Sequence, residues 1–137
     1  HDQMKAWCGK YPPEVVQAQF YKMAGMWKVG LSRMRAVVEK ARGKRVAEHD
    51  LAIAETCWSH FQSVAQQVEF YRLRDGARDV GRMKELVRAE MELARRQYAV
   101  ARAFSTVGYE ATNHYYYRPL DLAEKVVQCD WLGKKLS

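Results

Sequence analysis

Two pairs of residues in this 137-residue chain have a spacing that could support chemistry. Cys57 and His60 are three residues apart, so on a helix they would share a face, where an imidazole could take the proton of a thiol. Glu110 and His114 have the i,i+4 spacing of two metal ligands on a helix. Neither pair belongs to a longer pattern, and a buried thiol beside a helical histidine is the simpler interpretation of the first.

The motifs of the common catalytic and cofactor-binding families are absent from the sequence. There is no G-x-S-x-G, no glycine-rich phosphate loop and no C-x-x-C. A ferritin-like di-iron site needs two Glu-x-x-His motifs, yet Glu55 and His60 are five residues apart and Asn113 stands three residues after Glu110. We therefore expect no catalytic residue, metal or cofactor in this chain, and we do not expect the chain alone to be an enzyme.

One polar and aromatic cluster lies outside the expected helices, and its members are the candidate ligand or domain-interface residues: Asn113, His114, Tyr115, Tyr116, Tyr117 and Arg118. Tyrosine rings can stack on the CH faces of a sugar while the asparagine and histidine side chains hydrogen-bond its hydroxyls. The alternative is that the rings cover the end of a helical bundle with their hydroxyls reaching water or backbone. The segment alone favours this packing role, because tyrosine is commonly half-buried.

The helices that must position this cluster are predicted from apolar residues that recur at spacings of three and four. They predict long helices at 13–42, 46–74 and 79–105 and a shorter helix at 119–132, with 1–12 as a lead-in and 106–118 as an aromatic loop. Pro13 suits a first helical turn, Asp79 is a natural N-cap, and Gly133 is the expected stop. The prediction is one all-α domain over 1–137, an antiparallel bundle of three long helices plus a shorter C-terminal helix.

The composition and charge of the chain indicate which classes of protein fit it. Hydrophobic residues make up 48% and charged residues 28% of the chain, which is typical of a globular domain. No run of 18 apolar residues occurs, so we expect no membrane span. The net charge of +7 leaves nucleic-acid binding as a weaker alternative, because acidic residues alternate with the basic ones as on solvated helix faces. The chain begins with His and has no apolar signal segment, so we expect a processed chain or a piece of a larger protein.

Three cysteines, Cys8, Cys57 and Cys129, are widely separated. Cys57 and Cys129 lie in apolar stretches, where a buried thiol is expected. A disulfide between Cys8 and Cys129 requires that the fold bring the two ends of the chain together, and the sequence leaves this open.

Three stretches carry a family resemblance: VAQQVEFYRLRD (64–75), EMELARRQYAVARA (90–103) and VGYEATNHYYYRPLDLAEKVVQCDWL (107–132). They resemble the C-terminal helical region of large bacterial proteins that carry a glycoside-hydrolase-like barrel, related to hexosaminidases and α-glucuronidases and including a domain of unknown function. The family pattern GFEASNHYYY-P-DL-EKVLNC aligns with Gly108 to Cys129. The chain departs from the family at 104–107, where Phe-Ser-Thr-Val replaces a more polar stretch.

The resemblance implies a non-catalytic accessory domain that packs against a catalytic barrel lying outside these 137 residues. It implies a parent protein of the glycoside-hydrolase type, an extracellular or periplasmic location, and an apolar surface patch where the barrel would sit. Segment 109–118 would reach that barrel or its sugar-binding cleft. A free-standing helical module that binds another protein is the alternative function.

Overall fold

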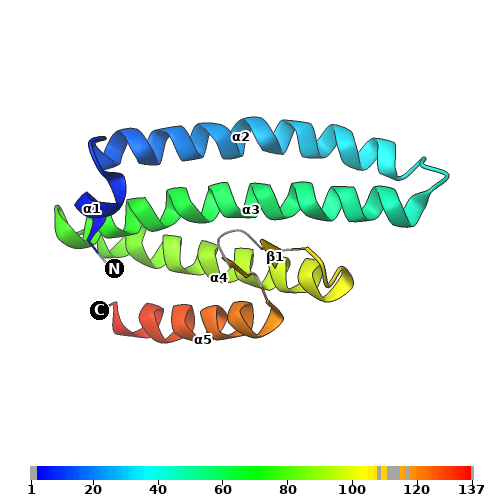
Figure 1. Ribbon diagram of the computed structural model, residues 1–137. Coiled ribbons are helices and arrows are strands. Elements are labelled where there is room, and N and C mark those ends of the chain that lie inside the picture. The colour runs from blue at the N-terminus through cyan, green and yellow to red at the C-terminus, as the bar shows by residue number, and fades with distance from the viewer. Residues whose placement is uncertain (1–2, 108, 111–114, 117, 137) are drawn as a thin grey trace.

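The computed structural model describes residues 3–107, 109–110, 115–116 and 118–136 (Figure 1). Its elements are α1 (Met4–Cys8), α2 (Pro13–Val38), α3 (Lys44–Asp75), α4 (Val80–Ala103), β1 (Tyr109–Glu110), β2 (Tyr115–Tyr116) and α5 (Pro119–Lys135). The expected all-α arrangement of three long antiparallel helices and a shorter C-terminal helix is confirmed. No helix within the described ranges has both the length and the apolar character needed to cross a membrane.

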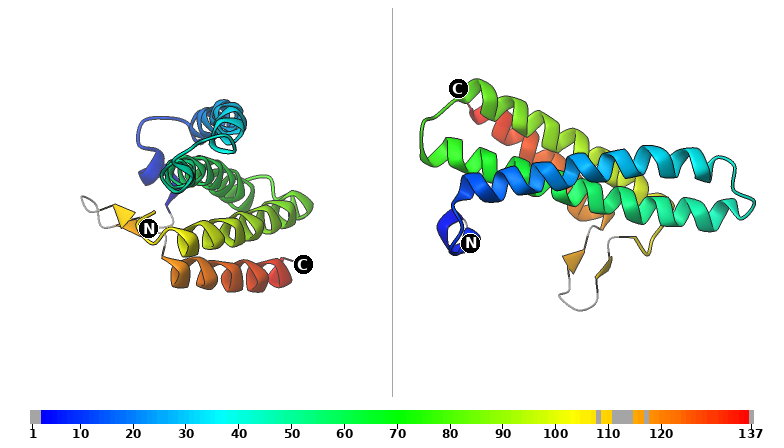
Figure 2. Two further views of the ribbon diagram at one scale, coloured as in Figure 1. Left: turned by 90° about the vertical axis from the view of Figure 1, so that its right-hand side faces the viewer. Right: turned by 90° about the horizontal axis from the view of Figure 1, so that it is seen from above.

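The four longer helices form a layer in sequence order. α2 packs on α3, α3 on α4, and α4 on α5, while α1 packs at one end against α2 and α3. Figure 2 shows the α2–α3 pair crossing the α4–α5 pair, so the helices are stacked and do not close around a single core. α2 and α5 are therefore the edge helices of the layer, and no other long helix that the structure describes lies on their outer sides.

The apolar core is concentrated between α4 and α5. One cluster is formed by Met83, Val87 and Leu136, and a second by Ala94, Ala101 and Leu122. The interface between α3 and α4 is different, because its buried side chains include polar and charged ones: Ser59, Ser63, Gln66, Glu90 and Gln97. Such groups are stable in an interface only when they are hydrogen-bonded or paired, so their partners determine how α3 and α4 align.

α2 joins this layer through its packing along α3. Its buried residues, Ala24, Leu31 and Val38, are seven residues apart and so form one stripe along the helix. The indole of Trp27 adds a T-shaped contact with Phe61 of α3 at a centroid distance of 5.5 Å. The helix ends at Val38 and not at the expected residue 42, because the backbone tightens into i→i−3 hydrogen bonds from Lys40 and Ala41 before it turns into α3.

Three further boundaries differ from the expectation. The lead-in contains the short helix α1, and the segment expected to be a loop at 106–118 contains an antiparallel pairing of β1 with β2. Gly133 does not stop α5, which continues to Lys135. The reason is that Leu136, just beyond it, is buried against Met83 and Val87, and this packing holds the last turn in helical form.

We expect Met83→Ala to lower the free energy of unfolding by about 2–5 kcal/mol, the range for truncating a buried methionine. Met83 is 2% exposed at the centre of the α4–α5 core. The matched control is Met26→Ala, since Met26 is exposed on α2 and its truncation should change stability by less than about 0.5 kcal/mol. Urea unfolding of both variants checks this, and equal losses would contradict the assignment of the core.

Candidate functional site

The aromatic cluster expected to form a site is described only in part. Asn113, His114 and Tyr117 lie outside the described residues. Tyr115 and Tyr116 form β2 and pair with Glu110 and Tyr109 of β1. Arg118 lies just before α5, where its Nε and a terminal nitrogen donate hydrogen bonds of 2.9 and 3.0 Å to the carboxylate of Asp121. This bidentate pair stabilises the first turn of α5 and lowers the pKa of Asp121.

Residues 103–106, which precede the aromatic cluster, contact the N-terminal end of α3. A recess of about 320 Å³ lies there, lined by Arg45, Val46, His49, Ala103, Phe104, Ser105 and Thr106. His49 Nε2 is 3.0 Å from Thr106 Oγ1, and the Arg45 guanidinium lies 4.3 Å from the centroid of the Phe104 ring. Arg45 also donates a hydrogen bond to the Ala103 carbonyl. These contacts cap the C-terminal end of α4, so Arg45 has a structural role.

The Cys57–His60 pair does not have the properties of a nucleophile and its base. Burial raises the pKa of the Cys57 thiol, and burial together with the charge of Lys125 lowers the pKa of His60. Both shifts favour the neutral forms and oppose a thiolate–imidazolium pair. All three cysteines are free thiols. Across the described part of the chain, no three His, Cys, Asp or Glu side chains come together as metal ligands.

A buried serine, a buried glutamate and a partly exposed lysine meet where α3, α4 and α5 adjoin. The carboxylate of Glu90 accepts hydrogen bonds from the Ser63 hydroxyl and the Lys125 ammonium, and Lys125 Nζ also lies 3.1 Å from Ser63 Oγ. Ser63 is buried in the middle of α3, where the neighbouring backbone N–H groups are used within the helix and offer no oxyanion hole. The cluster therefore joins three helices and has no arrangement for acyl transfer.

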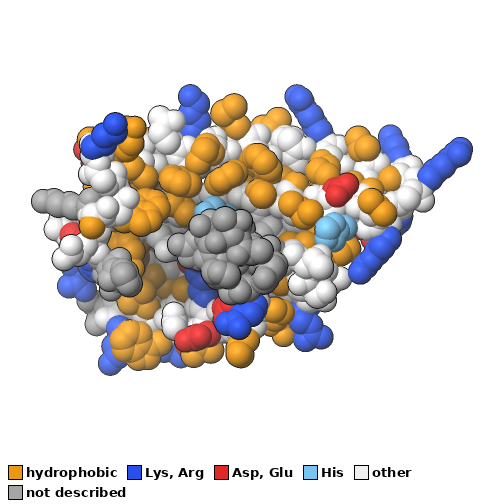
Figure 3. Space-filling view, in the orientation of Figure 1, with side chains coloured by type: hydrophobic (Ala, Val, Ile, Leu, Met, Phe, Trp, Pro, Cys, Tyr) orange, Lys and Arg blue, Asp and Glu red, His pale blue; other side chains and the backbone are white. Residues whose placement is uncertain are grey.

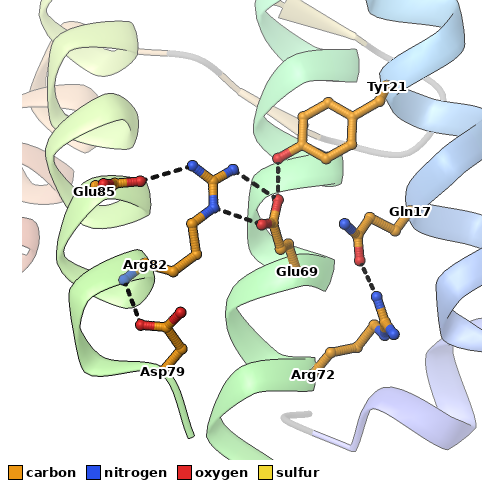
Figure 4. A network of polar contacts seen from close by, with 7 residues as sticks. All are labelled: Gln17, Tyr21, Glu69, Arg72, Asp79, Arg82 and Glu85. Atoms are coloured by element: carbon orange, nitrogen blue, oxygen red, sulfur yellow. Dashed lines mark hydrogen bonds and ion pairs between the residues drawn. The ribbon is translucent and has the colours of Figure 1, made fainter. Parts of the chain in front are cut away.

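Two glutamates of α3, Glu55 and Glu69, bridge α2 to α4 on one side of the layer, and Figure 4 shows the contacts of Glu69. Glu69 accepts hydrogen bonds from the Tyr21 hydroxyl and, at 2.7 and 3.2 Å, from Arg82. We call these residues the Tyr21–Glu69–Arg82 clamp. Its outer end extends to Glu85, which accepts a hydrogen bond from Arg82 at 2.9 Å.

The second bridge is the Arg35–Glu55–Arg96 clamp. Glu55 Oε1 accepts a hydrogen bond from Arg35 Nε at 3.0 Å and one from Arg96 at 3.3 Å. The side chains of Glu55 and Glu69 are 16% and 15% exposed, respectively. Each clamp thus holds a largely buried carboxylate between a donor from α2 and an arginine from α4.

Corresponding members of the two clamps are fourteen residues apart on every helix: Tyr21 and Arg35, Glu55 and Glu69, Arg82 and Arg96. Fourteen residues are about four helical turns, so both clamps lie on the same side of the layer. This spacing is present in the sequence as a signal. The sequence alone does not reveal the clamps, because charged residues at helical spacing normally indicate a solvated face. The six residues come together only through the register of the three helices.

The charge states within the Tyr21–Glu69–Arg82 clamp follow from these contacts. Burial tends to raise the pKa of Glu69, but the hydrogen bonds from Arg82 and Tyr21 outweigh it and hold that pKa below its usual value. Burial and the hydrogen bond to Glu69 raise the pKa of Tyr21. The clamp is therefore a carboxylate between a neutral phenol and a guanidinium at neutral pH.

Several basic residues that favoured nucleic acid in the sequence are engaged within the protein. Arg72 donates a hydrogen bond to Gln17 and lies 4.0 Å from Glu14, and Arg74 pairs with Asp75 at 2.6 Å. Together with the Arg82 contacts, these pairs reduce the positive potential that a phosphate backbone would require. The basic residues between positions 72 and 82 therefore offer little support for a nucleic-acid interface.

Comparison with protein families, curated proteins and solved structures gives no match to this chain.

We expect Glu69→Gln to lower the free energy of unfolding at pH 7 by about 1–3 kcal/mol, the range for hydrogen bonds to a charged group. Because the folded pKa of Glu69 is depressed, its stabilising effect is present above the unfolded-state value of about 4.3 and is lost as pH falls through the folded value. The difference between wild type and variant should therefore shrink below about pH 4, which urea unfolding at several pH values measures.

The control for this prediction is Glu85→Gln, which removes a carboxylate from the same Arg82. The Glu85 side chain is 62% exposed, so its loss should cost less than about 1 kcal/mol. Equal losses in the two variants, or a Glu69→Gln effect that does not change with pH, would contradict the role given to the buried carboxylate.

Proposed function

We propose that this chain is a non-catalytic helical domain that packs against another protein surface through the outer faces of its edge helices, α2 and α5. The observation that carries the proposal is a stripe of large exposed hydrophobic side chains on each helix. On α2 these are Val15, Met26, Val29 and Val37, and on α5 they are Leu120, Val127 and Trp131.

The spacing places each set on one side of its helix. Met26 and Val29 are three residues apart and Val37 follows eight residues later, which is a single helical face. Figure 3 shows hydrophobic side chains along the part of the surface where α2 runs, with Lys and Arg side chains projecting among them. Large hydrophobic side chains that gather on one exposed face of a helix can mark an interaction surface.

The charges on α2 indicate what kind of surface would fit. Lys22 and Arg33 are exposed within the same stripe, and among the described residues neither takes part in an ion pair. The acidic residues Glu14 and Glu39 stand only at the two ends of the helix. A complementary partner surface is apolar at its centre and carries acidic side chains opposite Lys22 and Arg33.

The sequence resemblance supports a specific partner for these faces, a glycoside-hydrolase-like barrel in the same polypeptide. A contact of Tyr115 and Tyr116 with a glycan and an extracellular or periplasmic location rest on the resemblance as well. If the chain instead works as a separate interaction module, the same two faces would bind a different protein. Cross-linking distinguishes a barrel in the same polypeptide from a separate protein partner.

The test places the photo-cross-linking residue p-benzoylphenylalanine at position 26 or 127 of the protein expressed in its own cells. The matched control is position 88, since Arg88 is exposed on α4 and belongs to neither stripe. We expect positions 26 and 127 to cross-link at several times the yield of position 88. Adducts within the same polypeptide would support a barrel neighbour, and adducts to one separate protein would support the interaction module. Equal yields at all three positions would overturn the docking role.

A further inference from the structure

A cleft of about 370 Å³ lies between the two clamps, with α3 as its floor and α2 and α4 as its walls. It is lined by Tyr21, Ala24, Gly25, Lys28, Trp58, Gln62, Gln66, Ala89, Glu92, Leu93 and Arg96. The volume falls within the usual range for small-molecule sites, which is about 300–1,000 Å³. The docking faces of α2 and α5 take no part in it, so it is independent of the proposed function.

The cleft exists because the repeat of the clamps is interrupted at its middle position. Lys28, Gln62 and Ala89 stand midway between corresponding clamp members, seven residues from each, and all three line the cleft. α4 therefore presents a methyl group where the clamps have an arginine, and α3 presents a neutral amide where they have a carboxylate. Lys28 takes part in none of the ion pairs between described residues, so the middle layer keeps a cation and lacks an anion.

Two residues of α3, which forms the floor, have polar atoms without partners. Gln66 is 8% exposed, and its Oε1 has no hydrogen-bond partner among the described residues, as is true of Trp58 Nε1. Arg96 lies 5.2 Å from the centroid of the Trp58 ring and brings a second positive charge to the cleft. The one carboxylate in the lining is that of Glu92, which is paired with Arg95. A buried donor that lacks a partner is costly, so Trp58 Nε1 favours a ligand that accepts a hydrogen bond, whereas Gln66 Oε1, itself an acceptor, gives a carboxylate no support.

We infer that this cleft binds a small carboxylate ligand, whose carboxylate occupies in the middle layer the place that Glu55 and Glu69 occupy in the clamps. The Lys28 ammonium and the Gln62 amide N–H are its donors, and the Arg96 guanidinium adds charge from the side. The rings of Trp58 and Tyr21 offer apolar contact to the body of the ligand.

The clamps themselves exclude a longer occupant. They cross from α2 to α4 at both ends of the cleft and are about 21 Å apart along α3, from fourteen residues at about 1.5 Å each. A partner helix is about 10 Å wide and would have to break both clamps to lie along the groove. The compartment therefore fits a small molecule and not a helical segment.

The experiment is an NMR titration of the ¹⁵N-labelled protein with sodium acetate, the smallest carboxylate probe, against sodium chloride at equal ionic strength. We expect the Trp58 indole N–H resonance to shift and to saturate with acetate alone. The indoles of Trp7, Trp27 and Trp131 are internal controls, because none of them lines the cleft. A shift that fails to saturate, or that chloride reproduces, would overturn the inference.

Two variants test the donor set and a third controls for charge. Lys28→Met removes the main cation, and Gln62→Glu supplies the carboxylate from the chain itself; each should weaken acetate binding at least tenfold. Lys22→Met removes a lysine from the outer face of α2 and should leave binding within twofold of wild type. Persistence of binding in both cleft variants, or its loss in Lys22→Met, would also overturn the inference.

Gln62→Glu gives a second measurement that does not depend on the probe. Because the new carboxylate would complete a third clamp with Lys28, the thermal midpoint of this variant should rise without acetate and should no longer increase when acetate is added. Circular dichroism establishes that each variant is folded. A midpoint that falls in Gln62→Glu, with acetate still stabilising the variant, would show that the middle layer does not receive a carboxylate.

Discussion

The arrangement of helices depends on three carboxylates that are withdrawn from water. Glu55 and Glu69 leave α3 on one side, and Glu90 leaves α4 toward α3 and α5. An unpaired buried carboxylate costs several kcal/mol, whereas one held by well-placed donors does not carry that full penalty. The helices must therefore align so that each carboxylate meets its donors, and only one register of α2, α3 and α4 satisfies the two clamps at the same time.

Apolar packing and polar pairing make different contributions to the helix interfaces. Met83, Val87 and Leu136 supply the apolar contact between α4 and α5. At the α3–α4 interface Phe70 and Leu73 pack against the same cluster, and hydrogen bonds such as the one from Gln97 Nε2 to Thr56 Oγ1 at 2.8 Å are added. Hydrophobic contact is not directional, while hydrogen-bonded pairs are, so the first supplies stability and the second supplies alignment. Because the layer is open, surfaces such as the outer face of α2 remain available for a partner.

Much of the fold could be predicted from the sequence, because apolar periodicity and caps mark helices locally. Asp79 is an N-cap as expected, and its Oδ1 accepts a hydrogen bond from the backbone N–H of Arg82 at 2.9 Å. The stacked arrangement could not be predicted, since periodicity identifies an apolar face without naming the helix it meets. In α2 both Leu31, which is buried, and Met26, which is exposed, fit a helical stripe. The clamps were missed because Glu55 and Glu69 have the spacing of a solvated face.

The position of α2 at the edge of the layer has a consequence for how the molecule opens. Among the long helices α2 packs only on α3, and it buries only Ala24, Leu31 and Val38. An edge helix that packs on a single long neighbour can separate from it in sub-global unfolding while the rest of the fold persists. The α4–α5 pair would retain its core in such a state. A partner that binds the outer face of α2 only when α2 is packed on α3 would stabilise the packed state. Such a partner would slow amide hydrogen exchange along the whole of α2.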